Sequence, residues 1–130
     1  MIHRMLKTIP DETVVCAQSD LVPHLSHREK IFVFPLNWRV ADYVFLDLYS
    51  TSFPVSANQY RRQVRQVFLN SRMGILEYND GILLFKRDYP NTLNETIYKV
   101  FLPLINHTRT SDGRAGIPKG RYVVPLNPIP

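Results

Sequence analysis

Residues 13–48 read TVVCAQSDLVPHLSHREKIFVFPLNWRVADYVFLDL, and this stretch contains three short apolar runs. The runs predict strands at 13–17, 30–34 and 42–48, with a short helix or tight loop at 19–28. Each run is nearly continuously apolar, whereas a strand with one solvated face alternates apolar and polar residues. The stretch therefore predicts a sheet with both faces covered by helices.

Three further helices are expected around this stretch. Apolar spacing predicts a helix at 3–9, which Pro10 ends, and a longer helix at 56–70 with Ser56 as its N-cap. A third periodic segment covers 93–105, and we expect Pro103 to bend or end it.

A hairpin is expected late in the chain, because the apolar runs 75–78 and 82–85 flank Asn79-Asp80-Gly81. Together these elements predict a single three-layer α/β domain over residues 1–105. Its sheet would be mixed and mostly parallel, with about five strands, helices on both faces and the antiparallel hairpin at its end.

Residues 106–130 differ in composition from the rest of the chain. They contain three of the five glycines and four of the ten prolines, which predicts an extended or partly disordered tail. They also hold four basic residues against one acidic residue, so most of the net charge of +5 lies in this segment. Nucleic acid is therefore not an expected partner of the folded part, and Arg61, Arg62 and Arg65 are interpreted as a solvated helix face.

The densest polar segment includes His24, Ser26, His27 and Arg28. Two histidines three residues apart can share a helix face, but a metal site needs further ligands and no spacing identifies them. Ser26, His27 and Asp42 have the residue types of a catalytic triad without the sequence context of one. No glycine-rich phosphate loop is present. We therefore expect no catalytic residue, no metal and no cofactor.

Ligands of open α/β sheets bind beyond the carboxyl ends of the strands. If the first three strands are parallel, one edge of the sheet gathers Ser19, Asp20, His24, Pro35, Asn37 and Asp47. Trp38 would either be a stacking platform for a sugar or base, or anchor its loop to the core. The candidate binding residues are His24, Ser26, His27, Arg28, Trp38 and Asp47.

The single cysteine, Cys16, lies in an apolar run and is expected to be a small buried hydrophobe. No stretch approaches the roughly 18–20 apolar residues needed to cross a bilayer. We therefore expect the chain as given to be soluble.

Several segments resemble the C-terminal soluble region of a family of uncharacterised prokaryotic polytopic membrane proteins. The membrane cores of that family are similar to those of lipid-phosphate-sugar-dependent (GT-C type) glycosyltransferases. The resemblance implies an extracytoplasmic α/β domain that follows many transmembrane helices, with the catalytic carboxylates in the membrane core. The segments that carry it are Ile9-Pro10, Val14-Val15-Cys16-Ala17, Leu21-Val22-Pro23-His24-Leu25-Ser26-His27-Arg28, Phe34-Pro35, Ala41-Asp42-Tyr43-Val44-Phe45-Leu46-Asp47 and Gly81-Ile82-Leu83-Leu84-Phe85-Lys86-Arg87.

Two hypotheses follow. In the first, the chain is a non-catalytic accessory domain of a glycosyltransferase-like membrane protein. Its partners would be the membrane-embedded part of the same polypeptide and a sugar or lipid-linked acceptor. In the second, it is a stand-alone module that binds a small sugar or anion, with His24, His27 and Arg28 as donors and Trp38 as a stacking partner. The oligomeric state stays open.

Overall fold

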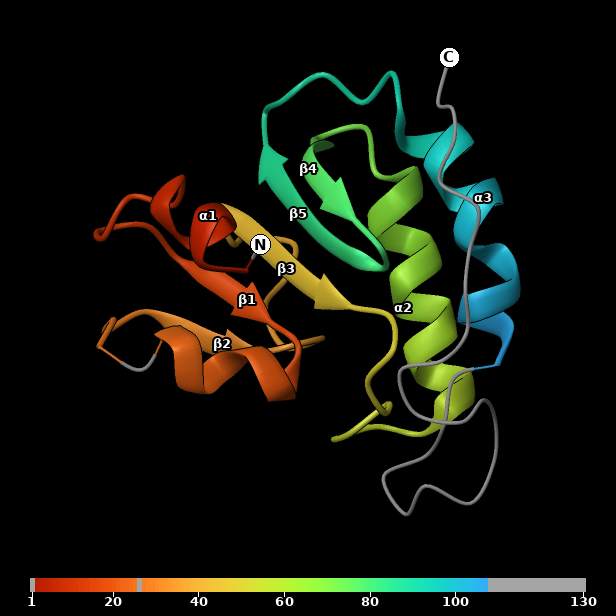
Figure 1. Cartoon of the computed structure of the whole chain (residues 1–130), viewed down its shortest axis with the longest axis horizontal. Helices are drawn as coiled ribbons and strands as arrows, with labels where there is room; N and C mark the ends of the chain where they lie inside the picture. Colours follow the sequence, from red (N-terminus) through yellow and green to blue (C-terminus); the bar gives the residue numbers. More distant parts are fainter. Residues whose placement is uncertain (1, 26, 108–130) are drawn as a thin grey trace.

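The computed structural model describes residues 2–25 and 27–107, with side chains from Arg4 onward. Helices and strands alternate along most of the chain (Figure 1). The elements are α1 (Ile2–Lys7), β1 (Val15–Ala17), the 3-10 helix η1 (Ser19–Leu25), β2 (Ile31–Val33), β3 (Tyr43–Asp47), α2 (Ala57–Leu69), β4 (Met73–Asn79), β5 (Ile82–Arg87) and α3 (Asn94–Asn106).

The five strands form one mixed sheet in the order β2-β1-β3-β5-β4. β1 pairs in parallel with both β2 and β3, so that Cys16 lies between Phe32 and Val44. β5 pairs antiparallel with β3 on one side and with β4 on the other. The expected mixed α/β sheet with a late hairpin is confirmed, with its parallel pairs on the β2 side and its antiparallel pairs on the hairpin side.

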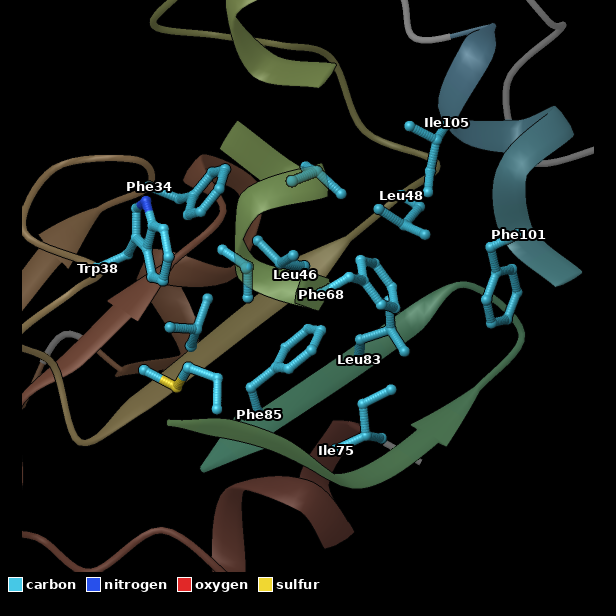
Figure 2. Close-up of a cluster of buried hydrophobic side chains, with 14 of the residues drawn as sticks. Phe34, Trp38, Leu46, Leu48, Phe68, Ile75, Leu83, Phe85, Phe101 and Ile105 are labelled. Carbon is cyan, nitrogen blue, oxygen red and sulfur yellow. The ribbon is translucent and has the colours of Figure 1, made fainter. Parts of the chain in front are cut away.

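Helices cover both faces of the sheet, as the apolar strands predicted. On one face α1 and η1 contribute Met5, Leu21 and Leu25, which pack with side chains of β1 and β3. On the other face lie α2 and α3, and Figure 2 shows the larger core between them and the sheet. At its centre the rings of Phe68 and Phe85 meet edge to face, with their centroids 5.1 Å apart.

α2 begins where the sequence predicted, because the Ser56 hydroxyl accepts a hydrogen bond from the backbone N–H of Gln59 at 3.1 Å. Pro103 was expected to bend or end this helix, and it does not end it, because α3 continues through Pro103 to Asn106. Proline near a helix end removes only one backbone donor. The burial of Leu104 and Ile105 holds the last turn in place.

The hairpin turns at Asp80 and Gly81, which both have positive φ (47° and 86°), as expected of an Asn-Asp-Gly signal. Asn94, at the start of α3, ties the hairpin to the helices. Its buried amide donates to the carbonyls of Phe68 at 2.9 Å and Met73 at 2.7 Å. Its side-chain oxygen accepts the N–H of Ile75 at 3.3 Å. One side chain therefore joins α2, β4 and α3.

The predicted tail falls mostly outside the described residues, which end at His107. The extended or disordered character expected for it stays a prediction. Within the described part of the chain, none of the helices has the length and apolar character needed to cross a membrane.

Candidate functional site at the carboxyl end of the parallel strands

The topology creates a switch point between the carboxyl ends of β1 and β3. The chain leaves β1 through η1 on one face of the sheet, whereas after β3 it continues to α2 on the opposite face (Figure 1). Adjacent parallel strands whose connections diverge in this way form a topological switch point, where open α/β sheets bind ligands. Residues that follow β1 and end β3 are therefore the first candidates for a site.

A buried polar network forms the floor of the candidate site at this edge. The side-chain amide of Gln18, 1% exposed, donates to the carbonyl of Thr51 at 2.8 Å. The Tyr60 hydroxyl, from the first turn of α2, donates to the side-chain oxygen of Gln18 at 2.8 Å. Because these groups satisfy one another away from water, they fix the positions of β1 and α2 at this edge.

Above this floor lies a pair of carboxyl groups, Asp20 in η1 and Asp47 at the end of β3. Burial, followed by the hydrogen bond to Asp20 and its negative charge, raises the pKa of Asp47 to about 8. The backbone N–H of Tyr49, 3.0 Å from Oδ1 of Asp47, acts in the opposite direction. Near neutral pH, Asp47 therefore keeps its proton and shares it with Asp20.

The hairpin turn completes the site from the other side. The Tyr49 hydroxyl donates to Oδ1 of Asp80 at 3.0 Å. The ring of Tyr49 lies so close to Gly81 that a Cβ there would be 2.8 Å from it. Asp80 adds a second negative charge, besides that of Asp20, that raises the pKa of Asp47. The edge offers carboxyl oxygens as hydrogen-bond acceptors, which suit ligands rich in hydroxyl groups better than anions.

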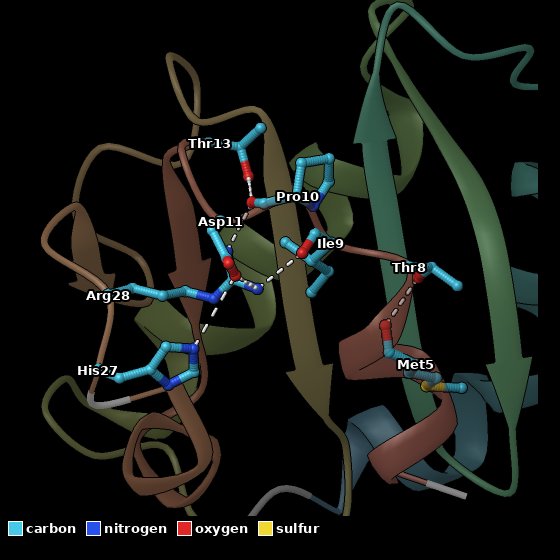
Figure 3. Close-up of polar contacts among 8 residues, drawn as sticks. All are labelled: Met5, Thr8, Ile9, Pro10, Asp11, Thr13, His27 and Arg28. Atoms are coloured by element: carbon cyan, nitrogen blue, oxygen red, sulfur yellow. Dashed lines mark hydrogen bonds and ion pairs between the residues drawn. The ribbon is translucent and has the colours of Figure 1, made fainter.

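The His27–Arg28 segment lies at the opposite edge, beside the amino ends of β1 and β2 (Figure 3). The Arg28 side chain, 3% exposed, donates to the carbonyls of Ile9 at 2.7 Å and Pro10 at 2.6 Å. His27 is exposed and lies 4.0 Å from a carboxylate oxygen of Asp11. Arg28 thus holds two loops together. It also lines a shallow hollow of about 440 Å³.

Trp38 lies away from Asp47, against α2. Trp38 is 2% exposed, and its ring N–H donates to the side-chain oxygen of Gln63 at 2.8 Å, so it anchors its loop to α2. His24 is exposed on η1. Ser26 lies outside the described residues. Parallel pairing of β1 and β3 instead brings Asp47 to Asp20, which the sequence had placed at the same edge.

Sequence reasoning missed Gln18 and Tyr60, which build the floor. Gln18 directly follows the first apolar run, a position that could have attracted attention. Tyr60 was assigned to the apolar stripe of its helix, and nothing local indicates that its hydroxyl reaches β1. Among the described residues, no group of three or more His, Cys, Asp or Glu side chains could hold a metal ion.

Comparison with known proteins identifies one family. A family model described as "Predicted membrane protein (DUF2079)" matches residues 1–84. The match covers α1, all of the parallel strands and α2, and it includes Asp20 and Asp47. No curated protein and no solved structure matches the chain.

Proposed function

The chain belongs to the DUF2079 family of predicted membrane proteins, and from that premise we propose that it is a non-catalytic accessory domain outside the bilayer. The observation that carries this proposal is the open sheet: among the described residues, its edge strands β2 and β4 each have a neighbouring strand on one side only. Unpaired strand edges are not tolerated in hydrocarbon, because their backbone groups would lack hydrogen-bond partners. The partner of the domain is then the membrane-embedded part of the same polypeptide.

The finer part of the proposal concerns the side of the membrane and the activity of the whole protein. We propose an extracytoplasmic position and a glycosyltransferase-like membrane core, in which the reaction takes place. The resemblance of residues 21–28 and 41–47 to such proteins supports both points. The domain would cover the reaction site or hold the acceptor.

Topology reporters test the extracytoplasmic position. Alkaline phosphatase or green fluorescent protein would be fused after His107 in the polypeptide as cells make it. We expect active phosphatase and no fluorescence, since the first folds outside the cytoplasm and the second folds inside it. The reverse pattern would refute the extracytoplasmic position.

A second assay tests the non-catalytic role. The purified chain is incubated with free and lipid-linked sugar donors, and transfer and hydrolysis are measured. We expect neither reaction. Turnover that disappears in Asp47→Asn but persists in Asp88→Asn would show that the domain is itself an enzyme.

The Asp20–Asp47 pair favours a second candidate function, the binding of a sugar or a sugar-bearing acceptor. Carboxyl oxygens at a switch point can accept hydrogen bonds from several sugar hydroxyls. The anion alternative has less support, because the Arg28 guanidinium already donates to two carbonyls at the other edge.

Backbone NMR titration with a panel of mono- and disaccharides tests this candidate. We expect saturable shifts around Gln18 and Asp47, and their loss in Asp47→Asn. The matched control is Asp88→Asn. Asp88 is exposed and follows β5, at the end of the hairpin opposite to its turn. Shifts that are absent in the wild type, or that survive in Asp47→Asn, would exclude the site.

A further inference from the structure

One side of the molecule combines exposed apolar side chains with unpaired positive charge. It consists of the loop between β2 and β3 and the outer face of α2. Three of the four large apolar side chains that the described part of the chain exposes lie here, and they are between 52% and 64% exposed. The α2–loop surface is defined by Leu36, Arg39, Val40, Arg62, Arg65 and Leu69.

Contacts join the two segments of this surface. Arg39 stacks on the Trp38 ring, 4.4 Å from its centroid, and donates a hydrogen bond to the side-chain oxygen of Gln66. A hollow of about 260 Å³ is lined by residues of both segments, including Val40 and Gln63. On α2, Arg62, Arg65 and Leu69 follow one another at helical spacing, on the stripe opposite the buried one.

The charge of this surface has a single sign. Neither α2 nor residues 33–41 contain an acidic residue. Several basic side chains elsewhere pair with carboxylates, as Arg87 does with Asp42 and Lys99 with Glu95. Within residues 2–25 and 27–107, neither Arg62 nor Arg65 makes such a pair. The surface is therefore complementary to a negatively charged partner.

The apolar side chains decide which negative partner fits. Arginines that flank exposed leucine and valine are typical of surfaces that lie in a lipid headgroup layer, where cations meet phosphates and apolar groups enter the acyl boundary. A surface for single-stranded nucleic acid would instead offer exposed aromatic rings for stacking. The Trp38 ring is buried under Arg39.

We propose that the α2–loop surface binds the anionic headgroup layer of a membrane, with its arginines at lipid phosphates and Leu36, Val40 and Leu69 between headgroups. The inference rests on the family membership and on this surface. It is independent of the sugar site, which lies at the carboxyl edge of the sheet.

Flotation of the purified chain with vesicles tests the proposal. We expect binding to equimolar phosphatidylglycerol and phosphatidylcholine and little binding to phosphatidylcholine alone. Each basic residue near an anionic membrane contributes about 1 kcal/mol, which is about fivefold in partitioning. The double variant Arg62→Glu/Arg65→Glu should therefore bind at least about 25-fold more weakly. Leu36→Ser should weaken binding several-fold without a change in charge.

The matched control is Lys7→Glu/Lys99→Glu, which changes the net charge equally at exposed positions on α1 and α3. It should retain most of the binding. The only tryptophan of the chain, Trp38, gives a positional readout, because brominated lipids quench fluorescence only at short range. We expect them to quench Trp38 in anionic vesicles.

Three results would overturn the proposal. The first is a wild-type chain that does not float with anionic vesicles. The second is equal loss of binding in the α2 variant and the control, which would indicate net charge alone. The third is tighter binding of duplex DNA than of vesicles in the same buffer, which would assign the surface to nucleic acid.

Discussion

The protonated Asp47 predicts an unusual dependence of stability on pH, which Asp47→Asn should abolish. The pKa of Asp47 is raised to about 8 by burial and by Asp20, whereas the same group in the unfolded chain has its ordinary value of 3.8. Between these values the folded protein holds a proton that the unfolded chain has lost. This stabilisation is complete below about pH 4 and is lost as the pH rises through about 8.

The magnitude follows from the number of protons involved. One proton bound by the folded state alone changes the free energy of unfolding by about 1.4 kcal/mol per pH unit. Between pH 5 and pH 7 the wild-type protein should therefore lose up to about 3 kcal/mol, a large part of the 5–15 kcal/mol typical of a domain. Asparagine has the shape of the protonated acid and can donate to Asp20 in the same way. The variant should thus be nearly independent of pH in this range.

Urea unfolding at pH 5, 6, 7 and 8, followed by the fluorescence of the buried Trp38, measures the effect. Asp88→Asn changes an exposed aspartate of the Arg72 ion pair and should retain the wild-type slope. The pKa of Asp42 is lowered by hydrogen bonds from Val14 and Arg87, so its contribution is lost only in more acidic solution. Parallel curves for wild type and Asp47→Asn would refute the protonated pair.

Three further predictions concern the stability of the fold. Arg28→Ala removes a buried guanidinium that donates to two carbonyls, so urea unfolding should show that the free energy of unfolding falls by about 2–4 kcal/mol. For the exposed His27 the change His27→Ala should lower it by less than about 0.5 kcal/mol. Asn94→Ala leaves two buried carbonyls and one N–H without their partner, so the same assay should show a loss of about 2–4 kcal/mol. Burial raises the pKa of the Cys16 thiol to about 12, so Ellman's reagent should react with it at pH 8 only in denaturant, and fast reaction of the native protein would contradict the packing.

Local sequence patterns were sufficient for much of the fold. The apolar runs located the strands of the parallel half, although the structure shortens each by one or two residues at its ends. Ser56 and the Asn79-Asp80-Gly81 turn fixed a helix start and a hairpin, because capping and turn chemistry depend on adjacent residues. The periodic segment 93–105 located α3 to within one residue at each end, and Pro103 does not end the helix because the buried Leu104 and Ile105 hold its last turn.

The candidate site was less predictable, because its contacts join distant residues. Tyr60 reaches Gln18 across 42 positions of the sequence. Arg28 was expected to face a ligand, yet its partners are backbone carbonyls, which leave no pattern in a sequence. Asp47 was placed correctly at the edge because parallel strands align their carboxyl ends. Its protonation depends on burial beside Asp20, which only the packed structure specifies.

The proposed sugar site and the proposed membrane surface are joined by α2, and this link constrains how both could work together. The first turn of α2 carries Tyr60, whose hydroxyl donates to Gln18 at the candidate site. Arg62, Arg65 and Leu69 lie on the outer face of the same helix. A helix of 13 residues is about 20 Å long, and one that lies flat on a membrane has both ends at the rim of the contact. The Asp20–Asp47 edge would then open sideways, just above the headgroups, where the sugar of a lipid-linked acceptor is displayed. On this geometry the domain should bind anionic vesicles that display a lipid-linked sugar more tightly than either contact alone would allow. Arg62→Glu/Arg65→Glu should weaken that binding and leave the affinity for the free sugar unchanged.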